Sequence, residues 1–250
     1  MSAAVRKVAL VTGASRGIGR AVALALAAAG YAIGVNYAAR RGEAEGLVAE
    51  IARGGSGAVA LAADVSDRTA VERMFEALDA RFGRLDALVN NAGVGRRVER
   101  LTDIDDETWR RTLAVNLDGA FYCMRAAIPR LQRAGGGRIV NVSSGAARTG
   151  GAVGAHYAAS KAGMLALTAK AARELARDGI AVNAVLPSVI ETDMLAAVAP
   201  DAAARERAKA QIPIGRFGRP DEVAAVVRFL VVEAPDYLSG ECISVRGARL

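Results

Sequence analysis

The feature that most constrains the fold is a glycine-rich turn between the first apolar run and the first helical segment. The run Val5–Thr12 is short and rich in valine, as in a buried parallel strand. The motif TGASRGIG follows at once, with Gly13, Gly17 and Gly19, and leads into the Ala-rich segment Arg20–Ala29. Glycine permits a tight turn and close backbone approach, and a helix N-terminus presents free N–H groups to phosphate. This order predicts a dinucleotide-binding unit.

The rest of the chain alternates apolar runs with segments of helical spacing. Strands are expected at Val5–Thr12, Tyr31–Tyr37, Ala58–Ala63, Leu85–Asn90, Arg138–Ser143, Ile180–Leu186 and Glu241–Val245. Helices are expected at Arg20–Ala29, from the second strand to about Arg53, and at Arg68–Phe82, Asp105–Arg133, His156–Arg177 and Asp221–Val232. The alternation predicts an α/β fold, a single-domain Rossmann-type doubly wound parallel sheet of about seven strands. The domain would span 1–250, with a cofactor half to about 140 and a catalytic half from about 141. The polar segment Glu191–Lys209 is expected to form a mobile lid over the substrate.

Composition narrows the class of protein. The 250 residues are 52% hydrophobic and 24% charged, enough for a large globular core. No apolar run is long enough to span a bilayer, the N-terminus lacks a signal-peptide layout, and Cys123 and Cys242 lack metal-ligand spacing. We therefore expect a cytoplasmic protein with no metal and no membrane partner. The net charge of +7 would attract nucleic acid, but the arginines are interleaved with acids and aromatics are only 4%, so we expect no nucleic-acid partner.

The end of the second strand decides which dinucleotide is favoured. An acid there would accept from the ribose 2′-hydroxyl and repel a 2′-phosphate. This chain instead has Asn36 and Tyr37, with no acid until Glu43. Arg40 follows closely, and Arg16 lies in the glycine-rich turn. We therefore predict NADP (NADPH) rather than NAD; the alternative is that Arg40 and its neighbour only begin the next helix.

Two further strand ends suit the same ligand. Asp64 and Val65 end the third strand, where the carboxylate and adjacent backbone could hold the adenine. NNAG, at 90–93, ends the fourth strand. Ligands bind at the carboxyl ends of strands in doubly wound sheets, so both segments are expected to line the site. Arg96 and Arg97 follow, either as exposed loop charges or as a contact for an acidic substrate.

The catalytic candidate is the segment from Ser144 to Lys161. Tyr157 and Lys161 are four residues apart in Ala-rich sequence, so on a helix they share one face. An ammonium beside a phenol favours phenolate and lowers the tyrosine pKa from about 10. Ser144, in the loop after a strand, can donate a hydrogen bond to the same oxygen. The three would polarise a carbonyl and protonate it as hydride arrives, or run the reverse reaction. The alternative is that Tyr157 and Lys161 are two ordinary residues on a helix.

Two polar residues lie in or beside these helices. Asn116, at the centre of the helical pattern 105–133, needs hydrogen-bond partners. It is either a satisfied core amide or the centre of a kink whose freed backbone groups and amide hold a water. His156, the only histidine, adjoins Tyr157. It should face away from the catalytic oxygen, because neighbours on a helix point about 100° apart.

The motifs occur in one order along the chain: TGASRGIG (12–19), Asp64, NNAG (90–93), Asn116, Ser144, YAASK (157–161), IETDM (190–194) and GRFGRPDEVA (215–224). Together they resemble the short-chain dehydrogenase/reductase family over nearly the whole chain. Within that family the likeness is greatest to the 3-oxoacyl-acyl-carrier-protein reductase group. The pattern is highly specific to the superfamily and much less so to any substrate.

The resemblance implies a role for each matched residue. Tyr157 would donate or accept the proton, Lys161 would lower its pKa and hold the nicotinamide ribose, and Ser144 would orient the substrate oxygen. Asn116 would hold a water in a proton relay to solvent. Ile190 and Thr192 match the positions that hold the carboxamide. The cofactor-binding residues implied are Gly13, Ser15, Arg16, Gly17, Ile18, Gly19, Asn36, Tyr37, Arg40, Asp64, Val65, Asn91, Ala92, Gly93, Tyr157, Lys161, Pro187, Ile190 and Thr192.

Three departures from the family pattern bear on these expectations. Pro-Gly after the sixth strand is here Pro187–Ser188, which would cost about 1 kcal/mol if the second residue needs φ > 0. The C-terminal Asp-Gly-Gly appears as Arg246–Ala248, which puts the usual subunit contact in question. Asp178 stands where carrier-protein users commonly have a basic residue.

The resemblance implies NADPH-dependent reduction of a carbonyl to a secondary alcohol, with a 3-oxoacyl thioester or similar β-keto substrate. Two alternatives stay open: another alcohol, sugar or steroid dehydrogenase of the superfamily, and a non-catalytic NADP-binding regulator. The intact Asn, Ser, Tyr and Lys set argues against the regulator. We expect a homotetramer, with a dimer as the fallback, because the helices 105–133 and 156–177 carry apolar and Ala-rich faces that pair across a two-fold axis in the family.

Overall fold

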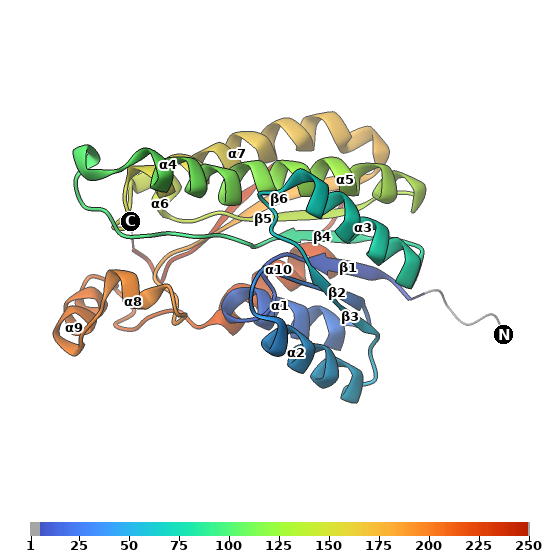
Figure 1. Cartoon of the computed structure of the whole chain (residues 1–250), viewed down its shortest axis with the longest axis horizontal. Helices are drawn as coiled ribbons and strands as arrows, with labels where there is room; N and C mark the ends of the chain where they lie inside the picture. The colour runs from blue at the N-terminus through green and yellow to red at the C-terminus, as the bar shows by residue number, and fades with distance from the viewer. Residues whose placement is uncertain (1–5, 250) are drawn as a thin grey trace.

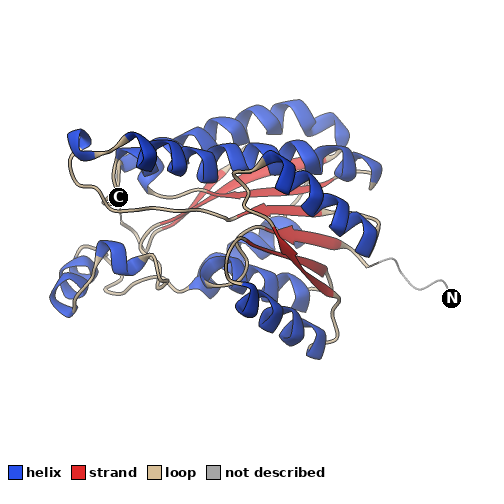
Figure 2. Ribbon diagram, in the orientation of Figure 1, coloured by secondary structure: helices blue, strands red, loops and turns tan. Residues whose placement is uncertain are grey.

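Seven strands form one parallel sheet with helices on both faces (Figures 1 and 2). The structure is a computed structural model and describes residues 6–249. The strands are β1 (Val8–Val11), β2 (Ala32–Tyr37), β3 (Ala58–Ala62), β4 (Ala87–Asn90), β5 (Gly137–Val142), β6 (Ile180–Pro187) and β7 (Cys242–Val245). Their spatial order is β3-β2-β1-β4-β5-β6-β7, and every neighbouring pair is parallel. The predicted fold class is confirmed.

Side chains alternate along β1, so the sheet contributes to a hydrophobic core on each of its faces. Val8 and Leu10 lie on one face with α3, α5 and α7, while Ala9 and Val11 lie on the other with α1, α2 and α10. Both faces are therefore buried, as an all-parallel sheet requires. The long helices are α1 (Gly17–Ala28), α2 (Arg41–Arg53), α3 (Arg68–Phe82), α4 (Asp106–Leu113), α5 (Gly119–Arg133), α7 (Ala155–Leu175), α9 (Ala202–Ala210) and α10 (Pro220–Val232). The short ones are α6 (Ala146–Thr149), α8 (Leu195–Val198), η1 (Leu101–Asp103), η2 (Ala114–Asp118) and η3 (Ala176–Asp178).

The strand order reverses at β1, and this reversal locates the ligand site. From β1 the chain builds outward to β2 and β3, then returns to the other side of β1 with β4. The loops that follow β1 and β4 therefore diverge and leave a crevice at the carboxyl ends of the strands. The glycine-rich turn and NNAG are those two loops.

The single helix predicted for 105–133 is wrong at its centre. The chain forms α4, then the π-helical turn η2, then α5, and the Gly119 N–H donates to the Ala114 oxygen five residues back. Gly119 also lies so close to Val65 that a Cβ there would be 2.7 Å from a Val65 methyl carbon. The inserted turn changes the direction of the Asn116 side chain, and π-turns of this kind occur mostly at functional sites.

Other boundaries differ by a few residues. The helix predicted from Arg20 begins at Gly17, inside the glycine motif, and Val5 of the first predicted strand lies outside the described residues. The segment 191–209 forms α8 and α9, set beyond the end of the sheet in Figure 1; its mobility stays a prediction. Within residues 6–249, no helix is long and apolar enough to cross a membrane, and no group of three His, Cys, Asp or Glu is arranged to bind a metal ion.

Candidate active site

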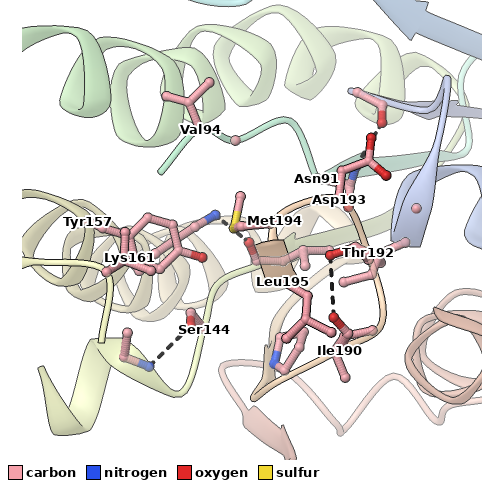
Figure 3. Close-up of a pocket in the computed structure, with 18 of the residues that line it drawn as sticks. Asn91, Val94, Ser144, Tyr157, Lys161, Ile190, Thr192, Asp193, Met194 and Leu195 are labelled. Atoms are coloured by element: carbon pink, nitrogen blue, oxygen red, sulfur yellow. Dashed lines mark hydrogen bonds between the residues drawn. The ribbon is translucent and has the colours of Figure 1, made fainter. Parts of the chain in front are cut away.

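A cleft of about 980 Å³ lies at the carboxyl ends of the strands (Figure 3). It is lined by the loops after all seven strands, together with parts of α7 and α9. Nearly all the predicted site residues line it: Gly13, Ser15, Arg16, Gly17, Ile18, Asn36, Tyr37, Arg40, Asp64, Val65, Asn91, Ala92, Gly93, Ser144, Tyr157, Lys161, Pro187, Ile190 and Thr192. Gly19 and Asn116 do not line the cleft.

The glycine-rich turn fits tightly against the loop after β4. Gly13 has φ +61°, and a Cβ there would be 2.8 Å from the Ala92 Cα. A Cβ on Gly19 would be 2.5 Å from both the Asn91 Nδ2 and the Gly13 oxygen. These contacts hold the glycine-rich turn against the loop after β4, while Gly17 and Ile18 at the start of α1 line the cleft, where helix N–H groups can bind a phosphate.

Thr12 ties the two loops together, and sequence reasoning gave it no role. Its Oγ1 accepts the N–H groups of Asn91 at 2.9 Å and Ala92 at 3.0 Å. The Asn91 amide returns hydrogen bonds to the Thr12 oxygen at 2.9 Å and the Gly13 oxygen at 3.1 Å. The only signal in the sequence is a hydroxyl residue directly before the first glycine.

Asn36 lines the cleft, but its amide is engaged by backbone. Its Oδ1 accepts the Gly13 N–H at 3.0 Å, and its Nδ2 donates to the oxygens of Leu61 at 3.2 Å and Ala63 at 3.0 Å. The side chain is buried. Asn36 therefore braces the loop after β1 against β3 and leaves direct contact with a ribose to its neighbours.

Asp64 is similarly engaged. Its carboxylate accepts from the Ser66 hydroxyl at 2.7 Å and from Arg111 Nη2 at 2.7 Å. Partial burial acts to raise the pKa of Asp64, but the hydrogen bonds from Ser66 and Arg111 outweigh it and hold that pKa below its usual value. Arg111, which sequence reasoning missed, fixes this end of the cleft from α4.

Two cations beside the end of β2 share one anion. Arg16 and Arg40 both form ion pairs with Asp193, which lies just before α8; the Arg40 Nη2 to Asp193 Oδ2 distance is 3.8 Å. Arg40 also pairs with Glu43 at 3.1 Å. Partial burial and then the charge of Arg40 lower the pKa of Arg16. An anionic ligand at this position could take the place of Asp193 as the partner of both arginines.

Ser144, Tyr157 and Lys161 lie together on one wall of the cleft (Figure 3). Helix α7 places the phenol and the amine one turn apart, with side chains almost entirely buried. The Lys161 Nζ donates to the Val142 oxygen at 2.9 Å and lies 5.9 Å from the centre of the Tyr157 ring. The Ser143 hydroxyl donates to the Lys161 oxygen at 2.8 Å, which joins α7 to the loop after β5.

Burial controls the charge states of this group. It raises the pKa of Tyr157, while the Ser144 hydroxyl acts in the opposite direction. It also lowers the pKa of Lys161 from 10.5 to about 8. The net shift at Tyr157 is opposite to the one expected from the Tyr-x-x-x-Lys spacing, because desolvation disfavours phenolate. At pH 7 the phenol therefore keeps its proton and Lys161 is mostly charged.

Asn116 is fully buried and joins two walls of the site. Its Oδ1 accepts the Val94 N–H at 2.8 Å, and its Nδ2 donates to the Val94 oxygen at 3.0 Å and to Ser160 Oγ at 3.0 Å. The Ser160 hydroxyl in turn donates to the backbone carbonyl oxygen of Tyr157 at 2.7 Å. Asn116 is thus a satisfied core amide within a kink. A water relay through it stays a proposal.

The expected backbone strain lies elsewhere. Among residues 6–249, Ala248 is the one non-glycine residue with positive φ, at +65°. Ser188 has no positive φ, so the cost expected there does not arise. Ala248 stands at the second glycine of the family's C-terminal motif, and the strain is found there instead.

His156 is buried and points to the loop after β4. Its Nε2 lies 3.0 Å from the Arg96 oxygen, and it does not line the cleft. The two arginines of that loop have acidic partners: Arg96 lies 3.7 Å from Asp105, and Arg97 lies 2.6 Å from Glu99.

Comparisons with known proteins agree with this geometry. The family model described as enoyl-(acyl carrier protein) reductase matches residues 13–247. The 3-oxoacyl-acyl-carrier-protein reductase FabG of Staphylococcus aureus is 43% identical over 241 residues, covering 96% of this chain and 97% of the relative. The corresponding reductase of Synechocystis is 40% identical over 253 residues, covering 99% and 98%.

Solved structures with the same fold carry other substrate assignments. A protein assigned provisionally as a gluconate dehydrogenase, from Agrobacterium tumefaciens, superposes with a TM-score of 0.92 at 36% identity, covering 97% of this chain and 95% of that one. A protein assigned provisionally as a short-chain alcohol dehydrogenase, from Sinorhizobium meliloti, gives a TM-score of 0.91 at 40% identity, covering 97% and 96%.

Proposed function

The chain belongs to the short-chain dehydrogenase/reductase family of oxidoreductases, and from that premise we propose that it uses NADPH to reduce the carbonyl of a 3-oxoacyl thioester or similar β-keto compound. The observation that carries the proposal is that Ser144, Tyr157 and Lys161 line the same cleft as the glycine-rich turn. A proton donor and a dinucleotide site thus share one space. The secondary alcohol is the product.

The β1–β4 side of the cleft fits a nicotinamide dinucleotide. The close approach of Gly13 to Ala92 and of Gly19 to Asn91 fixes the glycine-rich turn, whose Gly13 and Gly17 line the cleft. N–H groups at the start of α1 would bind the pyrophosphate. When bound, the cofactor supplies the hydride, and the chain supplies position and charge.

The substrate side provides the proton. Tyr157 donates its hydroxyl proton to the carbonyl oxygen, and Ser144 donates a second hydrogen bond to the same atom. Burial raises the pKa of Tyr157, so the phenol holds at pH 7 the proton that reduction requires. The Lys161 ammonium, 5.9 Å from the phenol ring, stabilises the negative charge that proton transfer leaves behind.

The preference for NADPH rests on Arg16 and Arg40. A 2′-phosphate there would replace the Asp193 carboxylate as their anionic partner. Kinetics with NADH and NADPH side by side test this, together with Asp193→Asn. We expect the wild-type chain to prefer NADPH, and the variant to bind NADPH more tightly with little change for NADH. Equal or better use of NADH by the wild-type chain would refute the preference.

The substrate class rests on the relatives named as 3-oxoacyl-acyl-carrier-protein reductases, at 40–43% identity over nearly the full chain. The structure assigned as a gluconate dehydrogenase supports a second candidate, oxidation of a sugar acid. A panel of β-ketoacyl thioesters, simple ketones and gluconate, each with the matching cofactor form, separates them. Fast turnover of gluconate with slow thioester reduction would reverse the choice. Tight NADPH binding without turnover of any substrate would favour the regulator.

The assembly we propose is a homotetramer, or a dimer if the C-terminal contact is altered by Arg246. Exposed apolar side chains support it: Trp109 on α4, Phe121 on α5 and Phe229 on α10 are each about two-fifths exposed. Light scattering measures the mass directly. A monomer at micromolar concentration would contradict both forms.

A further inference from the structure

The substrate end of the cleft carries a second group of cations. Arg207 on α9, and Arg246 and Arg249 after β7, line the same cleft as Tyr157. Pro187 pairs with Val245 in the sheet, so Arg246 follows directly beside the loop after β6. The Arg246 Cδ lies 3.5 Å from the position of a Cβ on Gly145, the residue after Ser144. The stem of Arg246 thus lies against the loop that presents Ser144.

These three arginines differ from the others in the cleft. The other four have acidic partners: Arg16 and Arg40 pair with Asp193, Arg111 pairs with Asp64, and Arg97 pairs with Glu99. Within residues 6–249, no carboxylate lies within 4.0 Å of a charged nitrogen of the second group. Arg249 has an uncharged partner, the Gln211 Oε1 at 3.0 Å.

An uncompensated group of guanidinium ions on a cleft wall is best satisfied by an anionic ligand. Guanidinium presents a planar set of donors that matches carboxylate and phosphate. Arg246 and Arg249 are only partly exposed, which limits screening of their charge by solvent. The two carboxylates that line the cleft, Asp64 and Asp193, are already paired with arginines.

We propose that, among the β-keto compounds of the proposed function, the preferred substrate is a free β-keto acid rather than a thioester, and that Arg246, supported by Arg249 and Arg207, binds its carboxylate. This rests on the proposed function, because it assumes that Tyr157 acts on a carbonyl in this cleft. A phosphate offers the same chemistry. A carboxylate is preferred because the stem of Arg246 lies one residue from Ser144, which suits a charge a few bonds from the reacting carbon. The phosphate of a pantetheine arm is many bonds away.

The test compares matched charged and neutral substrates. Acetoacetate and levulinate are assayed with NADPH beside their ethyl esters, and acetoacetyl-coenzyme A beside acetoacetyl-N-acetylcysteamine. In Arg246→Gln we expect kcat/KM for the free acids to fall about tenfold to a hundredfold, as loss of a charge-assisted hydrogen bond implies. The ethyl esters should change less than about threefold. Arg246→Lys, which keeps the charge but not the planar donors, should restore part of the loss.

Arg148→Gln is the matched control, because Arg148 is exposed on α6 and does not line the cleft. It should leave both kinds of substrate unchanged, and melting curves confirm that each variant is folded. If Arg246→Gln lowers kcat/KM for the coenzyme A thioester and not for the free acids, the bound anion is a phosphate and the carboxylate assignment is overturned. An equal loss of kcat/KM for the free acids and their esters would mean that Arg246 has a structural role, and would overturn the inference. If the wild-type chain reduces no substrate of the three pairs, the proposed function fails instead.

Discussion

The two sides of the cleft are held in place by different means. On the cofactor side, Thr12, Asn36 and Asn91 form buried or partly buried hydrogen bonds to the backbone of neighbouring loops at 2.9–3.2 Å. On the substrate side, α8, α9 and the loops around them pack on a small cluster, formed by Leu195, Ala199, Ile212 and Phe217. The first side is held by polar side chains that form hydrogen bonds with backbone groups of neighbouring loops. The second is held by apolar packing of a separate small cluster, so substrate choice can change there without disturbing the hydrogen bonds of the cofactor side.

Tyr157→Phe gives the largest expected effect and separates the two sides. The substitution removes the transferable proton but keeps the ring and its packing. Turnover should fall by at least about 10²–10⁴-fold, the usual contribution of general acid–base catalysis. The Kd for NADPH, followed by fluorescence, should change little because the braced loops are untouched. Tyr122→Phe, on α5 outside the cleft lining, is the control. Near-normal turnover in Tyr157→Phe would end the proposed mechanism.

Lys161→Met tests the cost of burying an amine at the boundary between the two sides. The pKa of Lys161 is about 8 in the folded chain, compared with 10.5 for a lysine that is not buried. Between these values the unfolded chain binds more protons, so stability rises with pH through that window. Below pH 8 both states are charged, and the burial cost stays constant at about 3 kcal/mol.

Lys161→Met should therefore raise the free energy of unfolding of the ligand-free chain at pH 7, by at most about 3 kcal/mol, less about 1 kcal/mol for the lost hydrogen bond to Val142. The gain should shrink as pH rises from 8 toward 10.5. Denaturant titrations at pH 7 and pH 10 measure it, and Lys170→Met, an exposed lysine on the same helix, should show no such trend. Lower stability of Lys161→Met at pH 7 would contradict the burial argument. Activity should be lost, and NADPH should bind more weakly.

Gly19→Ala should damage the cofactor side by crowding its backbone. The added Cβ would lie 2.5 Å from the Gly13 oxygen and from Asn91 Nδ2, so a loop must move. Crowding of this kind typically costs about 1–3 kcal/mol, and NADPH should bind more weakly. Gly46→Ala, on α2 with open space around it, should stabilise the chain by about 0.5–1 kcal/mol. Equal melting temperatures for the two variants would refute the close approach of the loops.

The difference between backbone requirements and side-chain surroundings explains what the sequence could and could not predict. The glycine spacing and the alternation of strands and helices report backbone requirements, and they led to the fold. Nearly all the site residues that the motifs and the family resemblance suggested line the cleft, but many other lining residues were not predicted. The spacing of Tyr157 and Lys161 placed them on one face, but it says nothing of burial. The direction of the Tyr157 pKa was therefore missed, because it depends on the surrounding protein.

Hydrogen-bond partners that are distant in sequence could not be predicted either. Asn36 and Asp64 were assigned to the ligand, yet their polar atoms are engaged by Gly13 and Arg111, which are 23 and 47 residues away. No local pattern encodes such pairs. The polar residue in an apolar helical pattern allowed for a kink at Asn116, but its partner Val94, 22 residues away, could not be named from that pattern.

Ala248→Gly has the smallest expected effect and tests the C-terminal end of the substrate side. Ala248 has φ +65°, which costs a non-glycine residue about 1–2 kcal/mol. Glycine would relieve that strain but lose about 0.4–1 kcal/mol through the greater freedom of the unfolded chain. The net gain should therefore lie between about 0 and 1.6 kcal/mol, where each kcal/mol raises Tm by about 2–4 °C for a chain of this length.

Gly247→Ala is the matched opposite. Gly247 has φ +56°, and a Cβ there would be 2.7 Å from an Ile214 methyl carbon, so alanine should lower Tm. The Kd for NADPH should stay constant in both variants, because neither residue touches the braced loops. A drop in Tm for Ala248→Gly would mean that the positive φ is not kept in solution. Arg246 and Arg249, on either side of this turn, would then not be held at the cleft as described.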